Sequence, residues 1–131
     1  MSQENVELAR RYVEAFNAHG LEAAKELWHP EIELWDPPEL PDADRHAGRS
    51  AFQEQVEGYL ALGWDGQFRA PEYLDADEEV VVVWQGKGIS PQGVPIEATM
   101  AQVFLFYDGK VRRVRQYLSR AEALEAAGLS E

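Results

Sequence analysis

The stretch EIELWD at residues 31–36 alternates between polar and apolar side chains, which is typical of a half-buried β-strand. Ile32, Leu34 and Asp36 share one face of that strand, and the other three residues share the opposite face. A carboxylate is therefore predicted on the same side as two branched aliphatic side chains. Removed from water, it accepts a proton more readily than a surface aspartate does. Asp36 is thus a candidate base, and the alternative is an aspartate that only shapes the turn at Pro37.

Helices are predicted on both sides of this strand. Residues 3–18 carry apolar side chains at helical spacing, and a second helix is expected over about 21–28, ending before His29-Pro30. The proline-rich residues 37–48 are expected to form a loop. Ser50 and Gln53 have the spacing of a capping box and predict the start of a third helix.

The second half of the chain changes from helical to strand-like periodicity. Residues 67–74, 79–89, 96–107 and 110–118 are rich in Val, Phe, Tyr and Trp, and predict four strands. Asp108-Gly109 and residues 90–93 are turn sequences between them. A second capping box at Ser119 predicts a short last helix. The order predicts one α+β domain over residues 1–131, with a curved, mainly antiparallel sheet folded over the helices around a cone-shaped pocket.

Composition excludes several classes of function. The 131 residues carry a formal net charge of −12, so nucleic acid and anionic membranes are poor partners. There is no cysteine, which excludes disulfides, thiol catalysis and thiolate metal sites. No apolar run is long enough to span a membrane and no secretory signal is visible, so a cytoplasmic protein is expected.

Several motifs resemble the SnoaL-like and ketosteroid-isomerase-like branch of the nuclear transport factor 2 (NTF2-like) superfamily. They are RYVEAFNAHGLEAAKELWHPEIELWDP at residues 11–37, HAGRSA at 46–51, FLFYDGKV at 104–111 and YLSRAEAL at 117–124. The resemblance implies a cone-shaped α+β barrel in which a strongly bent sheet wraps around three N-terminal helices and a short C-terminal helix follows. It also implies a homodimer that forms through the outer face of the sheet.

The resemblance also suggests roles for individual residues. The base aspartate of the ketosteroid isomerases matches Asp36, and their helix-1 tyrosine matches Tyr12. Their protonated acid matches Gln102, whose amide can donate a hydrogen bond but cannot transfer a proton. The SnoaL-like cyclases use an acidic residue on a strand facing the cavity, and neither Gln102 nor Gln116 supplies one. Isomerase or cyclase activity is therefore an analogy, and Tyr12 has a purely structural alternative in the core.

Alternation along the last strands predicts the rest of the pocket wall. Gln102 and Gln116 would be polar anchors in an apolar pocket, or a pair that satisfies itself in the core. His46, in the loop before the third helix, is expected near the pocket mouth, with a solvent-exposed loop histidine as the alternative. The predicted substrate-binding residues are Gln102, Gln116, Trp84, Trp28, Met100, Phe104, Leu118 and His46.

These observations predict a cofactor-free enzyme that transfers a proton on a small apolar cyclic or polyketide-like molecule. Asp36 would be the base, and Tyr12 and Gln102 would stabilise the oxyanion. No metal site is expected, because Glu31 and Glu33 lie on the strand face opposite Asp36. Two alternatives stay open: a non-catalytic domain that binds a small ligand, and an interaction module that uses the outer sheet face.

Overall fold

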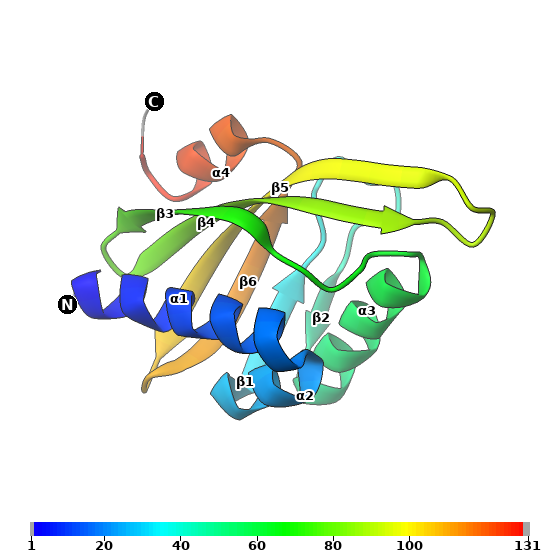
Figure 1. Ribbon diagram of the computed structural model, residues 1–131. Helices are drawn as coiled ribbons and strands as arrows, with labels where there is room; N and C mark the ends of the chain where they lie inside the picture. Colours follow the sequence, from blue (N-terminus) through cyan, green and yellow to red (C-terminus); the bar gives the residue numbers. More distant parts are fainter. Residues whose placement is uncertain (1, 130–131) are drawn as a thin grey trace.

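The computed structural model, which describes residues 2–129, is an α+β fold built on one six-stranded sheet (Figure 1). The strands are β1 (Trp28–Trp35), β2 (Arg45–Ala47), β3 (Arg69–Ala76), β4 (Glu79–Ile89), β5 (Pro95–Tyr107) and β6 (Lys110–Tyr117). Their order in the sheet is β2-β1-β6-β5-β4-β3. All neighbours are antiparallel except β1 and β6, which run parallel. The predicted α+β class is confirmed, with a sheet that stays open between its edge strands β2 and β3 in the described part of the chain.

The helices cover the two faces of the sheet unequally. The inner face packs against α1 (Ser2–His19), α2 (Leu21–Ala24), a 3₁₀ turn (Lys25–Leu27) and α3 (Arg49–Ala61). The outer face carries α4 (Arg120–Ala126), which packs on β4, β5 and β6. Alternation along β4 explains the division, because Val80, Val82 and Trp84 belong to the inner core and Val81 and Val83 to the outer one.

Three local expectations from the sequence are corrected. The second helix ends at Ala24, and Trp28 already belongs to β1, since the 3₁₀ turn leads directly into the strand. The loop at residues 37–48 contains the short strand β2, which pairs with β1. The Ser50 capping box does not form, because Gly48 occupies the N-cap position of α3.

Two other local signals are confirmed. Ser119 caps α4, since its side chain accepts a hydrogen bond from the backbone N–H of Glu122 at 3.1 Å. Asp108 and Gly109 both adopt positive φ angles of 55° and 71°, as a tight hairpin between β5 and β6 requires.

The β4–β5 hairpin extends past the rest of the sheet to the end of α3 (Figure 1). There the segment after α3 crosses β4 in direct backbone contact. The N–H of Ile89 donates to the carbonyl oxygen of Gly63, and the N–H of Asp65 donates to that of Lys87, both at 3.0 Å. A Cβ atom on Gly88 would collide with the backbone of Gly63, so the contact depends on glycine. This crossing fixes one side of a cavity under the sheet.

Candidate functional site

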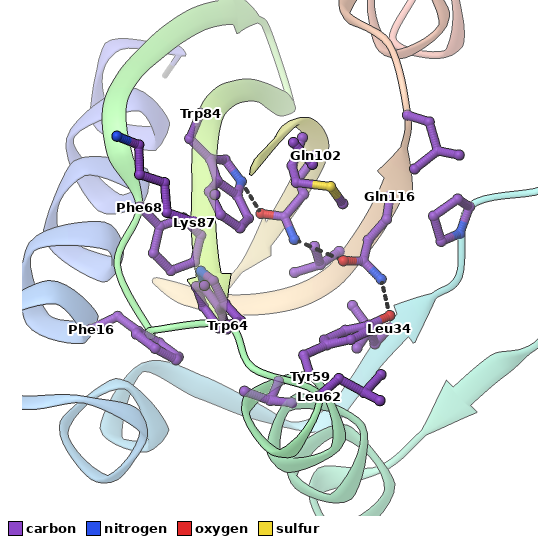
Figure 2. Close-up of a pocket in the computed structure, with 18 of the residues that line it drawn as sticks. Phe16, Leu34, Tyr59, Leu62, Trp64, Phe68, Trp84, Lys87, Gln102 and Gln116 are labelled. Carbon is purple, nitrogen blue, oxygen red and sulfur yellow. Dashed lines mark hydrogen bonds between the residues drawn. The ribbon is translucent and has the colours of Figure 1, made fainter. Parts of the chain in front are cut away.

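A cavity of about 310 Å³ lies between the inner face of the sheet and the helices α1 and α3 (Figure 2). Its wall is mainly aliphatic and aromatic, and a cavity of that size admits a small organic molecule. The lining residues include Tyr12, Phe16, Leu34, Phe52, Tyr59, Leu62, Trp64, Phe68, Trp84, Met100, Gln102, Phe104, Val114, Gln116 and Leu118.

Four aromatic rings form one side of the cavity. The ring of Phe68 lies 4.4 Å from that of Trp84, 5.3 Å from that of Phe16 and 5.5 Å from that of Trp64, measured between centroids. Asn17 fixes Phe68 at the end of α1, because its side chain accepts from the Phe68 N–H at 2.7 Å and donates to its carbonyl oxygen at 3.0 Å. These contacts hold flat apolar surfaces in place for a ligand.

A chain of hydrogen bonds between neutral side chains runs along the wall from one of these rings, Trp84, to Tyr59 (Figure 2). The indole N–H of Trp84 donates to Oε1 of Gln102 at 2.9 Å. Nε2 of Gln102 donates to Oε1 of Gln116 at 3.1 Å, and Nε2 of Gln116 donates to the hydroxyl of Tyr59 at 2.9 Å. The register of the sheet brings these side chains together. Gln102 is directly opposite Gln116 on β6 and Val82 on β4, and Trp84 is two residues from Val82 on the same face of β4.

The chain ends at the carboxylate of Asp36. The Tyr59 hydroxyl donates to Oδ1 of Asp36 at 3.4 Å, and Nε2 of Gln55 donates to the same oxygen at 3.2 Å. Oδ2 accepts from the backbone N–H of Asp44 at 3.2 Å and lies 3.0 Å from Nε2 of His46. The Asp36 side chain is only 8% exposed, so these partners take the place of water around its charge.

Tyr59 is the residue that joins this carboxylate to the cavity. Burial raises the pKa of its hydroxyl, hydrogen bonds from Gln55 and Gln116 oppose the rise, and the nearby charge of Asp36 adds to it. The hydroxyl therefore keeps its proton at neutral pH and donates it in a hydrogen bond to Asp36.

Tyr12 lies in the cavity wall but not beside Asp36. Its hydroxyl accepts a hydrogen bond from the indole N–H of Trp28 at 3.4 Å. Burial raises the pKa of Tyr12 to about 12, although the bond from Trp28 lowers it in part. Tyr12 is therefore protonated, and within residues 2–129 its O–H has no hydrogen-bond acceptor. It can donate that O–H to a ligand.

The structure brings most of the predicted substrate-binding residues together. Gln102, Gln116, Trp84, Met100, Phe104 and Leu118 all line the cavity, as does Tyr12. Gln102 and Gln116 combine the two alternatives, since they bond to each other and also face the cavity.

Three predicted residues lie behind the wall. Trp28 packs its ring against Phe52, with centroids 4.7 Å apart, and donates to the hydroxyl of Tyr12, so it contacts two residues of the wall from behind. His46 is held by Asp36, with 23% of its side chain exposed to solvent. Asp36 does not line the cavity, and it is connected to the wall by the hydrogen bond that it accepts from Tyr59.

Two residues of the site were missed from the sequence. Neither Tyr59 nor Gln55 was predicted as a site residue. The two side chains are four residues apart on α3, so they lie on one face of that helix, and Gln55 Nε2 donates to the Tyr59 hydroxyl at 3.3 Å. A polar pair at this spacing on an otherwise apolar face is the signal that could have identified them.

Within residues 2–129 no group of three or more His, Cys, Asp or Glu side chains is placed to hold a metal ion. In the same part of the chain, none of the helices combines the length and the apolar character that crossing a membrane requires.

Comparison with known proteins identifies the family. Residues 9–114 match the model of the SnoaL-like domain, so this chain belongs to the SnoaL-like domain family. A search of curated proteins found no match.

Solved structures share the fold over nearly their whole length. Bal32a, from a soil-derived mobile gene cassette, is 22% identical, with a TM-score of 0.77 over 95% of this chain and 96% of that protein. A protein provisionally named a polyketide cyclase, from Xanthomonas campestris pv. campestris, is 20% identical, with a TM-score of 0.75 over 96% and 98%. TerC, co-crystallised with polyporic acid, is 19% identical, with a TM-score of 0.71 over 95% and 98%. Other similar structures are named NTF2-like proteins, which confirms the predicted fold family.

Proposed function

We propose that this SnoaL-like domain is a cofactor-free enzyme that moves a proton on a small, mainly apolar molecule carrying a carbonyl group. The observation that supports it is the hydrogen-bond chain from Trp84 to Asp36 in the wall of an otherwise apolar cavity. A carboxylate enclosed in protein and joined to a ligand cavity by one hydroxyl is suited to general base catalysis.

Asp36 is the base in this proposal, and Tyr59 carries the proton. The substrate loses a proton from the carbon next to its carbonyl to the Tyr59 oxygen, as the Tyr59 proton passes to Oδ1 of Asp36. Nε2 of Gln55 lies 3.3 Å from the hydroxyl and 3.2 Å from Oδ1, so the hydrogen bond that it donates to Tyr59 can shift to the carboxylate, which frees a lone pair on the Tyr59 oxygen to accept the substrate proton. His46, partly exposed, gives Asp36 a route for proton exchange with solvent.

The electrons left by the proton form an enolate whose charge rests on the former carbonyl oxygen. Amide N–H groups of Gln102 and Gln116 and the hydroxyl of Tyr12 are the donors available in the wall to stabilise it. Hydrogen bonds to that charge lower the barrier because they are in place before the reaction begins. Return of the proton to a different carbon would make the reaction an isomerisation.

The test is hydrogen–deuterium exchange, which detects proton removal without knowledge of the natural product. The protein is incubated in D₂O with 1-indanone and 1-tetralone, and loss of the proton signal next to the carbonyl is followed by NMR. We expect exchange above the buffer rate, reduced by about a hundredfold to ten-thousandfold in Asp36→Asn. Asp44→Asn is the control and should exchange normally, because the Asp44 side chain accepts from the backbone N–H of Arg45 and the variant keeps the backbone N–H that Asp44 donates to Asp36.

A ligand-binding domain without catalysis is the second candidate. It is favoured because the Asp36 carboxylate already has four hydrogen-bonding partners, and one of them, Tyr59, separates it from the cavity. Binding of either ketone with exchange no faster than in buffer, in both the wild type and Asp36→Asn, would support this candidate and contradict the enzyme proposal.

The homodimer through the outer sheet face stays a prediction. Light scattering coupled to size exclusion would measure the mass in solution, and 14.8 kDa is the mass of one chain. A cytoplasmic location is likewise a prediction from the sequence.

A further inference from the structure

The direction of the hydrogen-bond chain is set at its first residue. An indole N–H can donate a hydrogen bond but cannot accept one, whereas a glutamine amide has a donor end and an acceptor end that can be exchanged by rotation. Because the Trp84 N–H lies 2.9 Å from the side chain of Gln102, the amide must turn its oxygen toward the indole. Its nitrogen then faces Gln116.

The same constraint passes along the chain. Gln116 must turn its oxygen toward the Gln102 nitrogen at 3.1 Å, which leaves its own nitrogen facing the Tyr59 hydroxyl at 2.9 Å. Tyr59 accepts that bond, so its proton is free to point at Asp36. If Gln102 were reversed, Gln116 would present its oxygen to Tyr59 and draw the hydroxyl proton away from the carboxylate.

The directions of these hydrogen bonds also determine which hydrogen-bonding group of a ligand the cavity wall can bind. Gln102 and Gln116 each have two N–H groups on the amide nitrogen. Within residues 2–129 each nitrogen donates to one partner, whereas each amide oxygen already accepts from a donor. A buried N–H without a partner is less tolerated than a carbonyl oxygen with one free lone pair. The unmet requirement in this part of the cavity is therefore a hydrogen-bond acceptor.

We propose that Trp84 is a positioning residue that sets the direction of the whole chain, and that the cavity consequently prefers ligands with a carbonyl or enolate oxygen over matched ligands with an N–H. This inference rests on the cavity as the ligand site of the proposed function. It does not require that catalysis occurs.

Three rigid ligands of one shape separate the possibilities: 9-fluorenone, which has a carbonyl oxygen, fluorene, which has no polar atom, and carbazole, which has an N–H. Fluorenone has no hydrogen on the carbons beside its carbonyl, so binding is measured where enolisation is impossible. By calorimetry we expect the wild type to bind fluorenone about three- to tenfold more tightly than fluorene, and carbazole no more tightly than fluorene.

Trp84→Phe keeps an aromatic ring and removes the N–H. The fluorenone preference should fall to about one, with fluorene affinity changed less than twofold, because only the donor that orients Gln102 is lost. Trp35→Phe is the control, since Trp35 lies outside the cavity wall and its indole N–H donates to Oε1 of Glu33 at 3.2 Å. It should keep the preference.

A second variant guards against misfolding of Trp84→Phe. Gln102→Met keeps the side-chain length and removes the amide, and it should abolish the same preference. The proposal is overturned if Trp84→Phe or Gln102→Met retains the preference, if carbazole is the best ligand of the wild type, or if none of the three binds. Failure of the exchange experiment with 1-indanone would remove the enzyme proposal and leave this binding result standing.

Discussion

The two faces of the sheet use different kinds of polar interaction. On the inner face, three neutral side chains pass hydrogen bonds from one to the next: Trp84, Gln102 and Gln116. The chain reaches one carboxylate, Asp36, only beyond the sheet. Neutral partners can be enclosed in an apolar wall at modest cost provided that each is bonded.

The outer face uses charges. Glu79 accepts from Arg113 at 2.8 Å and from Arg115 at 2.9 Å, and Glu33 accepts from Arg112 at 3.0 Å. The arginines of β6 thus form ion pairs with acidic neighbours. The apolar part of this face is covered by α4 through Ala123 and Leu124.

The difference suggests a division of roles between the faces. Hydrogen bonds between neutral groups are directional and little affected by salt, so they can orient a ligand and guide a proton. Ion pairs near solvent are screened by salt and contribute chiefly to stability. We therefore expect substitutions on the inner face to change binding and exchange, and those on the outer face to change the free energy of unfolding.

The largest effect is expected at Tyr59. Tyr59→Phe removes the hydroxyl that links the cavity to Asp36, so hydrogen–deuterium exchange of 1-indanone should slow by about a hundredfold or more. Tyr73→Phe is the control, because Tyr73 is a residue of β3 that lies outside the cavity wall, under the guanidinium of Arg10 from α1. Equal rates in the wild type and Tyr59→Phe would contradict a role for the hydroxyl in proton transfer.

The next effect is on the outer face. Leu124→Ala removes a buried side chain that joins α4 to the sheet, and we expect unfolding to become easier by about 2–4 kcal/mol in urea denaturation. Ile89→Ala, at an exposed position of the β4–β5 hairpin, should change the free energy of unfolding by less than about 0.5 kcal/mol. Fluorenone affinity at a temperature where the variant is folded should stay within twofold of the wild type. A tenfold loss of fluorenone affinity in Leu124→Ala would show that packing on the outer face affects binding on the inner face.

A smaller effect is expected at the charge cluster. Glu79→Gln leaves Arg113 and Arg115 facing a neutral amide, which should destabilise the fold by about 1–3 kcal/mol at low salt. At about 1 M salt the difference in unfolding free energy from the wild type should shrink, because the Debye length is then roughly 3 Å. Gln116→Leu on the inner face is the comparison, and its cost should be nearly independent of salt. A Glu79→Gln cost that is equally independent of salt would remove the distinction between the faces.

Much of this arrangement could be predicted from the sequence because alternation records which face a strand residue occupies. The bounds of β4 were predicted correctly, and the period of two along that strand separates Val82 and Trp84 from Val83. The positions of Gln102 and Gln116 on one side of neighbouring strands followed from the same period of two.

The contacts of Asp36 could not be predicted in the same way. Its partners come from α3, from β2 and from the turn before β2, and the pairing of β2 with β1 leaves no periodic signal in three residues. Nor does periodicity distinguish a side chain in the cavity wall from one behind it. Trp28 and Tyr12 bond to each other, yet only Tyr12 lines the cavity.

The smallest effect concerns Glu33 and depends on pH. Burial tends to raise the pKa of this carboxyl, but hydrogen bonds from Arg112 and Trp35 outweigh it, so the pKa is lowered from 4.5. A lowered pKa in the folded state means that the stabilisation is present above the unfolded value and is lost as the pH falls through the folded one. Glu33→Gln should therefore cost about 0.5–1 kcal/mol near pH 7 and almost nothing near pH 2, measured by urea denaturation at each pH. Glu31→Gln, an exposed acid on the same strand, should show no such difference. A cost of Glu33→Gln that is the same at both pH values would mean that its ion pair with Arg112 does not stabilise the outer face.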